Sequence, residues 1–376
     1  MTIHVETTAT QAAMGERRMP PLVHSSRSLE AYIPGDRRRA LARGETLPDR
    51  VRGAALLADI SGFTPMTEAL ANELGARRGA EELTRQLNRV FHALIEELDR
   101  FGGEVIYFSG DALTCWIDAD DGLRATACAL AMQRTMAGLA EVATPGGTVL
   151  RLAMKAAVAV GYARRFLVGD PDIQLIDALA GGIVDGLAAG EQLAKPGEVL
   201  LDAFALAALG DRVVIGETRE DGQGRRYGVV DCLACEVPAT PRISSNEPLP
   251  DEVVRRWLLP GIYERVAAGE ADFVAELRSA YSLFASFGGI DYEEVTAAAK
   301  LDDFVRRTQR ILVTYGGTLL HLTIGDKGAY LSAVFGPPFA HEDDAVRAAA
   351  AAIALRDVAS VTDVDQLRIG LTYGRL

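Results

Sequence analysis

Two aspartates have the residue type and spacing for metal-dependent chemistry. Asp59 ends an apolar run that begins at Ala54, and Asp111 follows Gly110 in the turn between two apolar segments. If the strands that carry them are neighbours, both carboxylates emerge at one edge of a sheet. They would repel each other there unless a cation lay between them. Carboxylate oxygens favour hard ions, so we expect two magnesium ions, with manganese as the alternative.

A pair of magnesium ions suits phosphoryl transfer, because one can activate an attacking oxygen while the other steadies a triphosphate. Ser61, Gly62, Phe63 and Thr64 directly follow Asp59. They should begin a helix whose free amides would hold phosphate oxygens. Each aspartate taken alone has a plainer explanation, since Asp is common in caps and turns and Gly-Asp is common in hairpins.

The elements that must position these aspartates can be predicted from the apolar pattern. Residues 54–60 are typical of a buried strand that ends at a Ser-Gly turn. Thr64 can cap a following helix with Pro65 in its first turn, and apolar residues at helical spacing over 83–98 indicate a second helix. Residues 105–117 have the pattern of a hairpin. We therefore predict an α+β fold with helices on one face of a mostly antiparallel sheet.

The same pattern occurs a second time in the chain. The Gly-Gly pair at 102 recurs at 316, the Gly-Asp pair at 110 recurs at 325, and Gly161 recurs as Gly374. The three offsets, 214, 215 and 213 residues, are nearly constant, which indicates two homologous domains. We predict a disordered tail over 1–30, a first domain over 31–238, a helical linker over 239–276 and a second domain over 277–376. The second copy stops soon after Gly374, so we expect that domain to be incomplete.

The composition disfavours two classes of partner. The net charge is −13, from 39 basic and 52 acidic residues, which disfavours nucleic acid and anionic membranes. No stretch reaches the ~18 uninterrupted apolar residues of a membrane helix, and the N-terminus lacks a secretory pattern. We expect a cytoplasmic protein. Of the four cysteines, Cys232 and Cys235 have zinc-knuckle spacing without a second pair, so we interpret all four as structural.

Two motifs together resemble a known family. LLADISGFTPMTEAL followed by GGEVIYFSGDALTCW resembles the catalytic-domain signature of class III adenylyl and guanylyl cyclases. GDKGAYLSAVFGPP in the second copy resembles the partner domain of soluble, bicarbonate-responsive adenylyl cyclases. It is closer still to bacterial multidomain cyclases that continue into an ATPase module and helical repeats. The resemblance covers roughly residues 32–376.

The resemblance implies two ferredoxin-like domains that form one active site between them, as a pseudo-heterodimer within one chain. It also implies that Asp59, Asp111 and the Ile60 carbonyl bind the two magnesium ions. The reaction would be the conversion of ATP to 3′,5′-cyclic AMP and pyrophosphate in intracellular signalling. His321 falls near the position of the family's base-recognising lysine, as Tyr107 does in the first copy, although a single His is more often a packed or surface residue. ATP is favoured over GTP.

The chain departs from the family pattern at three places. Aligning LLADISGFT with SLFASFGGI puts Ala285 opposite Asp59, or Ser286 after a one-residue shift, while Asp326 stays opposite Asp111. The family's Val-Asn-x-x-x-Arg reads Val184-Asp185-Gly-Leu-Ala-Ala189 in the first copy. The second copy's Asn and Arg would fall beyond Leu376. We therefore expect metal in the first domain only, and nucleotide binding with little turnover, since such an arginine contributes about 10³-fold or more to related phosphoryl transfers.

Two alternatives to an active cyclase remain. The first is a non-catalytic, cyclase-like module that binds nucleotide or bicarbonate and regulates a larger signalling protein. The missing Asn and Arg favour it, and the paired Asp59 and Asp111 oppose it, because a pure scaffold need not keep two like charges together. The second is a diguanylate cyclase. The hairpin Phe-Ser-Gly-Asp-Ala differs from the Gly-Gly-Asp/Glu-Glu-Phe motif of those enzymes, which disfavours it.

Overall fold

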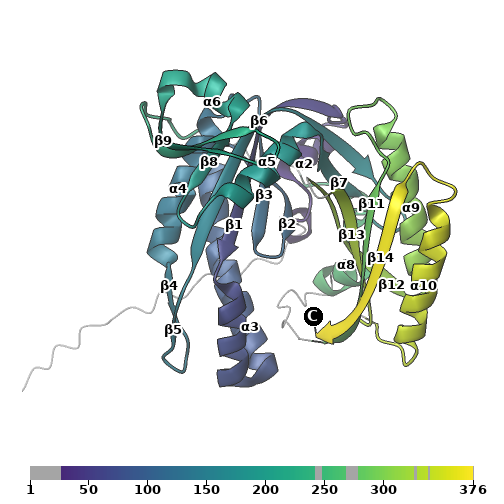
Figure 1. Cartoon of the computed structure of the whole chain (residues 1–376). Helices are drawn as coiled ribbons and strands as arrows, with labels where there is room; N and C mark the ends of the chain where they lie inside the picture. Colours follow the sequence, from purple (N-terminus) through teal and green to yellow (C-terminus); the bar gives the residue numbers. More distant parts are fainter. Residues whose placement is uncertain (1–26, 242–247, 268–277, 326–327, 338, 376) are drawn as a thin grey trace, which may run out of the picture.

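The computed structural model describes residues 27–241, 248–267, 278–325, 328–337 and 339–375, which form two sheets with helices packed on them (Figure 1). The larger sheet has eight strands in the order β2-β3-β1-β6-β8-β10-β9, with β7 paired to β6. Only its β6–β8 pairing is parallel. Its strands are β1 (Arg50–Ser61), β2 (Glu104–Ser109), β3 (Ala112–Asp118), β6 (Ala153–Val168), β7 (Ile176–Ala180), β8 (Val199–Asp202), β9 (Val213–Glu220) and β10 (Arg226–Leu233). A separate ribbon pairs β4 (Glu141–Ala143) with β5 (Val149–Arg151).

Helices cover both faces of the larger sheet. The α3 (Phe63–Arg100) and α4 (Leu123–Leu139) helices pack on one face, and Gly75 kinks α3 into the two helices that the sequence predicts. The α5 helix (Gly182–Leu193) packs on the other face. The prediction of helices on one face was therefore wrong. Its physical reason is that β1 is buried continuously from Gly53 to Leu56, so both of its faces need an apolar cover.

The turn from β1 into α3 also differs from the sequence prediction. The helix begins at Phe63, and its N-cap is Gly62, with φ of 106° and no side-chain cap. Thr64 is an exposed residue of the first turn and does not cap the helix. Glycine adopts this left-handed conformation at little cost, which lets the chain turn directly from the strand into the helix. The α6 helix (Ala203–Leu209) and the short η1 helix (Gly210–Arg212) follow β8.

The smaller sheet repeats the strand order of the larger one. Its order is β12-β13-β11-β14, which corresponds to β2-β3-β1-β6 in the larger sheet. The elements, in chain order, are β11 (Ser279–Gly288), α9 (Ala297–Thr314), β12 (Gly317–Gly325), β13 (Gly328–Phe335), α10 (Asp344–Val358) and β14 (Asp365–Arg375). The described residues therefore form an α+β architecture of the predicted class. The boundaries of the two domains stay a prediction.

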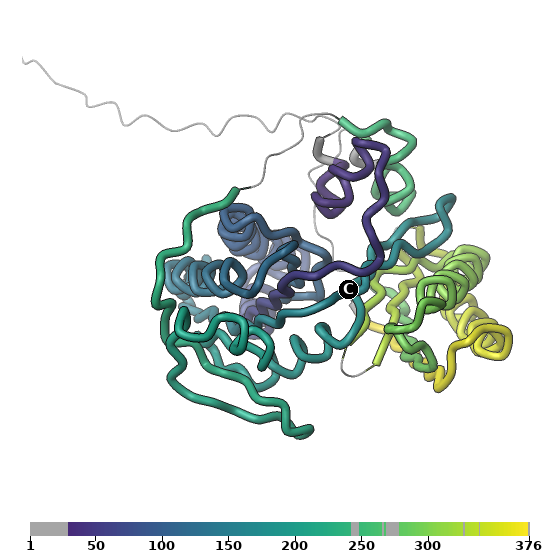
Figure 2. Tube along the Cα trace, turned by 90° about the horizontal axis from the view of Figure 1, so that it is seen from above, coloured from purple at the N-terminus to yellow at the C-terminus, as the bar shows by residue number. Residues whose placement is uncertain are grey.

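Short helices that precede the larger sheet in the chain meet short helices that follow it (Figure 2). They are α1 (Arg27–Glu30), α2 (Gly35–Ala42), α7 (Asp251–Arg255) and α8 (Pro260–Ala267). Leu29 is buried against Trp257 and Leu258 in one apolar cluster. The last four residues of the predicted tail are therefore helical, and the described part of the predicted linker contains two short helices, α7 and α8, joined by non-helical residues. Residues 1–26, 242–247 and 268–276, together with the side chain of Val266, lie outside the described part.

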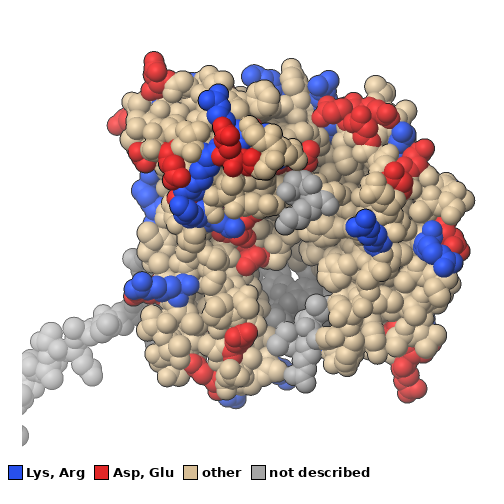
Figure 3. Space-filling model, viewed as in Figure 1, with Lys and Arg blue, Asp and Glu red and all other residues tan. Residues whose placement is uncertain are grey.

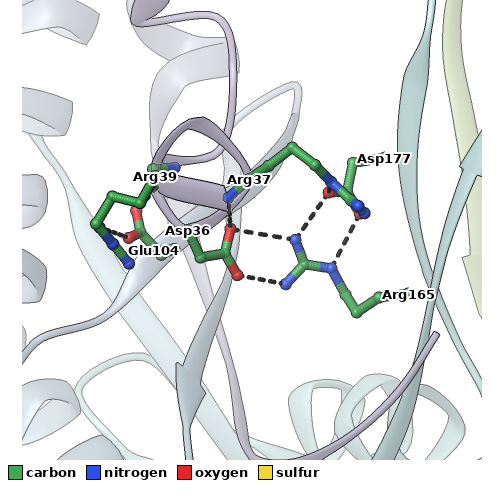
Figure 4. A network of polar contacts seen from close by, with 7 residues as sticks. Asp36, Arg37, Arg39, Glu104, Arg165 and Asp177 are labelled. Carbon is green, nitrogen blue, oxygen red and sulfur yellow. Dashed lines mark hydrogen bonds and ion pairs between the residues drawn. The ribbon is translucent and has the colours of Figure 1, made fainter. Parts of the chain in front are cut away.

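A buried polar network ties the β6–β7 arm to α2 (Figure 4), and the arm reaches from the half of the molecule that holds the larger sheet to the half that holds the smaller sheet. Arg165 on β6 donates to Asp177 on β7 and to Asp36 on α2, and Arg37 donates to Asp177 over 2.9 Å. Burial pushes the pKa of Asp177 upward, but Arg165 and then Arg37 hold that pKa below its ordinary value. Apolar residues of the arm belong to the core of the second half, so the arm fixes how the two sheets face each other. Within the described residues, no helix is long and apolar enough to cross a membrane.

Candidate functional site

The register of the larger sheet brings the two predicted aspartates together. Asp59 on β1 lies opposite Ala112 on β3, and Asp111 is the residue that precedes Ala112 in the hairpin turn. The amide of Ile60 donates to the carbonyl oxygen of Asp111 over 3.2 Å. Both carboxylates therefore emerge at the same end of neighbouring strands, as the sequence predicts. Their role as metal ligands, and that of the Ile60 carbonyl, stays a prediction.

The side chain of Asp59 lies on the face of β1 that α5 covers. Successive side chains of a strand point to opposite faces, and Ala58 and Ile60 belong to the core under α3 and α4. Asp59 therefore shares its face with Ala55 and Leu57, which pack in the cluster with α5. On this face the carboxylate points toward the gap between the halves.

The electrostatics of the pair favour a bound cation. Burial raises the pKa of Asp111, the negative charge of Asp59 raises it further, and the charge of Lys155 opposes this rise. A divalent ion would remove both the repulsion and the desolvation cost. Among the described residues, no group of three or more His, Cys, Asp or Glu side chains gathers to hold a metal. Two carboxylates still fit magnesium, which commonly keeps several waters and takes its other ligands from substrate phosphates.

Lys155 is a site residue that the sequence analysis missed. It lies opposite Asp59 on β6, and its Nζ is 3.4 Å from Asp59 Oδ2 and 2.5 Å from Glu191 Oε1 on α5. The sequence carries one usable signal, a lysine inside the otherwise apolar run from Leu152 to Val160. Lysine is rarely buried unless it is paired, so such a lysine indicates acidic partners nearby.

Asp59 and Glu191 line a cleft between the two halves. The cleft encloses about 310 Å³, and the surface in Figure 3 is hollowed between the halves. Its walls come from β1, the β2–β3 hairpin, α5 and the β12–β13 hairpin of the smaller sheet. The lining residues are Leu57, Asp59, Tyr107, Ser109, Ala112, Thr114, Val184, Leu187, Ala188, Glu191, Gln192, Thr323, Ile324, Gly325, Gly328 and Tyr330. The site is therefore shared between segments far apart in the sequence.

The predicted phosphate cradle does not line this cleft. Ser61 donates its hydroxyl to the Ala153 carbonyl over 3.3 Å, Phe63 is buried in the core, and Thr64 is exposed. None of these residues, nor Gly62, is among those that line the cleft. The structure thus brings Asp59 and Asp111 together without bringing the Ser61–Thr64 side chains to them. The role of the backbone amides there stays a prediction.

His321 lies beside the cleft and not in it. It lines a smaller cavity of about 130 Å³, whose wall includes Tyr107 and Thr323, and these two residues also line the Asp59 cleft. Partial desolvation lowers the pKa of His321, which favours the neutral ring. A contact between His321 and a nucleotide base is therefore still a prediction.

The counterpart of Asp59 in the smaller sheet is Ser286 and not Ala285. Ser286 lies opposite Arg368 on β14, as Asp59 lies opposite Lys155 on β6. Ala285 is buried in the core under α9 and α10, on the other face of β11. The alignment with Ala285 was therefore wrong by one residue, because a one-residue shift moves a side chain to the opposite face. Neither residue is a carboxylate, and Asp326 lies outside the described residues.

The cysteines take no part in the cleft. Cys115 and Cys128 are buried, and burial raises the pKa of both thiols, as expected for packing residues. Cys232 and Cys235 are exposed free cysteines. All four are free thiols that lie outside the set of cleft residues.

Comparison with known proteins identifies relatives among nucleotide cyclases. No protein-family model matches the chain. Over 151 residues the chain is 29% identical to adenylate cyclase type 10 of Mus musculus, which covers 40% of this chain and 9% of that protein. Over 65 residues it is 43% identical to adenylate cyclase type 10 of Homo sapiens, which covers 17% of this chain and 4% of that protein. The matches thus span less than a tenth of the length of these curated relatives.

Similar solved structures include a guanylyl cyclase and an adenylyl cyclase. The guanylyl cyclase Cya2 is 23% identical, with a TM-score of 0.41, over 52% of this chain and 98% of that chain. The adenylyl cyclase CyaB from P. aeruginosa is 22% identical, with a TM-score of 0.39, over 49% of this chain and 96% of that chain. The sequence matches to adenylate cyclase type 10 carry the assignment: this chain is a homologue of the class III adenylyl and guanylyl cyclases.

Proposed function

We propose that the cleft binds a nucleoside triphosphate together with magnesium ions and converts it to a 3′,5′-cyclic nucleotide and pyrophosphate. The observation that carries the proposal is the register that places Asp59 beside Asp111, with Lys155 directly opposite Asp59. ATP is favoured over GTP, because the curated relatives with matching sequence are adenylate cyclases.

The residues that line the cleft, and Asp111 and Lys155 beside it, each have a chemical task in this proposal. Asp59 and Asp111 would hold the ions, which when bound supply Lewis-acid activation of the ribose 3′-hydroxyl and neutralise phosphate charge. The ammonium of Lys155 would attract the oxygens of the triphosphate. Leu57, Val184 and Ile324 offer an apolar wall for a base. In the reaction, the 3′-oxygen bonds to the α-phosphorus, the bond to the β-phosphate oxygen breaks, and the hydroxyl proton passes to solvent.

One observation favours the second candidate, a regulatory module that binds nucleotide without turnover. The residues that line the Asp59 cleft in the described structure include no arginine. The α5 helix presents Ala188 and Glu191 to the cleft, so its described side chains offer no guanidinium to a transferred phosphoryl group. Binding is common to both candidates, and only turnover separates them.

The test combines nucleotide binding with product analysis. The purified chain would be given ATP or GTP with magnesium or manganese, and cyclic product would be separated by chromatography. Asp59→Asn and Asp111→Asn should each weaken metal-dependent ATP binding by about tenfold or more, because each removes half of the charge that holds the ions. Asp118→Asn, at the opposite end of β3, is the matched control and should bind as the unchanged chain does.

Two results would decide the matter. Unchanged metal-dependent binding in Asp59→Asn would refute the site assignment. Binding without any cyclic product, in this chain and in its gene extended past residue 376, would favour the regulatory module over the enzyme.

A further inference from the structure

Glu191 forms the closer of two ion pairs made by Lys155. Lys155 Nζ lies 2.5 Å from Glu191 Oε1 and 3.4 Å from Asp59 Oδ2. The three side chains are shielded to a similar degree, with exposed fractions of 23% for Lys155, 19% for Glu191 and 24% for Asp59. Charges screened from water to this extent interact more strongly than a fully exposed pair. The three therefore form one coupled unit across β6, α5 and β1.

The Lys155 ammonium already serves as a cation for the aspartates. Its charge opposes the rise in the pKa of Asp111 that burial and Asp59 cause, and it attracts Asp59. A divalent ion held by the same carboxylates would carry like charge within a few ångströms of that ammonium. Metal binding therefore requires Lys155 to withdraw from Asp59.

We propose that Glu191 regulates metal occupancy by keeping Lys155 paired when an arriving ion displaces its ammonium from Asp59. Lysine has a flexible stem and three donors, so its ammonium can leave Asp59 while it keeps the bond to Glu191. The lysine then stays beside the cleft without competing for the carboxylates. This inference rests on the metal-binding part of the proposed function and is independent of turnover.

Substitutions of Glu191 and of Lys155 should change the affinity for the metal ion in opposite directions. Without the Glu191 charge, Lys155 pairs with Asp59 alone and competes with the ion, so the metal binds more weakly. Without the Lys155 charge, the competitor is gone and the metal binds more tightly. A direct attraction between Glu191 and the ion would also weaken binding in Glu191→Gln, but it would do so whether or not Lys155 is present.

A double-mutant cycle separates these two explanations. Binding of Mn²⁺ to the full chain without nucleotide is measured from the electron paramagnetic resonance signal of the free ion. Glu191→Gln should raise the Mn²⁺ Kd by about tenfold, and Lys155→Met should lower it by about fivefold or more, as expected for partly shielded charges. Adding Glu191→Gln to Lys155→Met should change Kd by less than about twofold, because the partner of Glu191 is already gone.

The outcomes remain distinct if a step fails. An equal effect of Glu191→Gln in both backgrounds, or no effect in either, overturns the role of Glu191. Asp59→Asn is measured in parallel, and Mn²⁺ binding that survives it overturns the metal site itself. Thermal unfolding of each variant shows that the comparison is made between folded proteins, and Lys155→Gln provides a second neutral side chain should Lys155→Met fold poorly.

Discussion

Ser286 lies directly opposite Arg368 on neighbouring strands of the smaller sheet. Asp59 and Lys155 hold the same relationship in the larger sheet. In each sheet, therefore, a side chain with an oxygen acceptor lies across from a basic side chain at this position. Only in the larger sheet is that acceptor a carboxylate.

The first prediction concerns Ser286→Asp. A carboxylate opposite Arg368 should form a cross-strand ion pair and stabilise the fold by about 0.5 kcal/mol, a small gain because Arg368 is exposed. Urea unfolding against the unchanged chain measures it, with Ser286→Asn as the uncharged control. The interpretation is wrong if the aspartate destabilises the chain while the asparagine does not.

The second prediction is a pH dependence of stability from Asp202. Asp202 is 7% exposed, its carboxylate caps α6 by accepting from the Ala205 amide, and burial raises the pKa of that carboxyl to about 6. A raised folded-state pKa contributes stability below the unfolded value of 3.8, and that contribution is lost as pH rises through about 6.

Asp202→Asn should remove this dependence, since the amide keeps the capping oxygen without a charge. As pH rises from 4 to 7, the free energy of unfolding of the variant should rise relative to that of the unchanged chain, by up to about 3 kcal/mol. Urea unfolding of both proteins at several pH values measures the difference. A difference that stays constant from pH 4 to pH 8 would exclude the ionisation of Asp202 as its cause.

The third prediction concerns the buried network of the β6–β7 arm. Arg165→Met would leave Asp177 as a buried carboxylate beside Arg37 alone, and should cost about 3–5 kcal/mol. The side chain of Arg165 is 1% exposed, whereas that of Arg43, in a pair with Glu45, is 58% exposed. Arg43→Met is therefore the matched control and should change the free energy of unfolding by less than about 1 kcal/mol.

The same network predicts a response to acid. The ion pairs with Arg165 and Arg37 depress the pKa of Asp177, so their stabilisation is present above the ordinary aspartate value and is lost as pH falls through the lower, folded-state pKa. The unchanged chain should lose stability on acidification below about pH 4, more steeply than Arg165→Met does. Parallel acid titrations followed by circular dichroism would reveal the difference. Identical titration curves for the two proteins would contradict the prediction.

The fourth prediction compares two glycines near the site. Gly62 has a φ of 106°, and an added Cβ would lie 2.4 Å from the Arg151 carbonyl oxygen, while a Cβ on Gly110, at φ of 64°, meets nothing within 4 Å. Gly110→Ala should cost about 1 kcal/mol for backbone strain. Gly62→Ala should cost more and should weaken Mn²⁺ binding, because the backbone next to Asp59 must shift. Equal costs, measured by urea unfolding, would contradict the steric argument.

Local patterns in the sequence were enough to predict most of the elements around Asp59 and Asp111. The apolar run before Asp59 became β1, the Gly110 turn became the β2–β3 hairpin, and the helical spacing over 83–98 became the second part of α3. These features depend on neighbours along the chain, so residue spacing carries the information. The placement of helices failed where it depended on burial of both faces of β1, which is a property of the packed sheet.

The sequence by itself determined which two carboxylates could form the site, because each ends or turns a strand in a recognisable local pattern. Only the tertiary structure decided what surrounds them. Lys155 pairs with Glu191 because β6 and α5 pack side by side. Ser286, and not Ala285, is the counterpart of Asp59 because strand pairing sets the register. A shift of one residue reverses the face of every side chain on a strand, and contacts between distant segments follow from that register. Spacing along the chain carries no such information until the strands are paired.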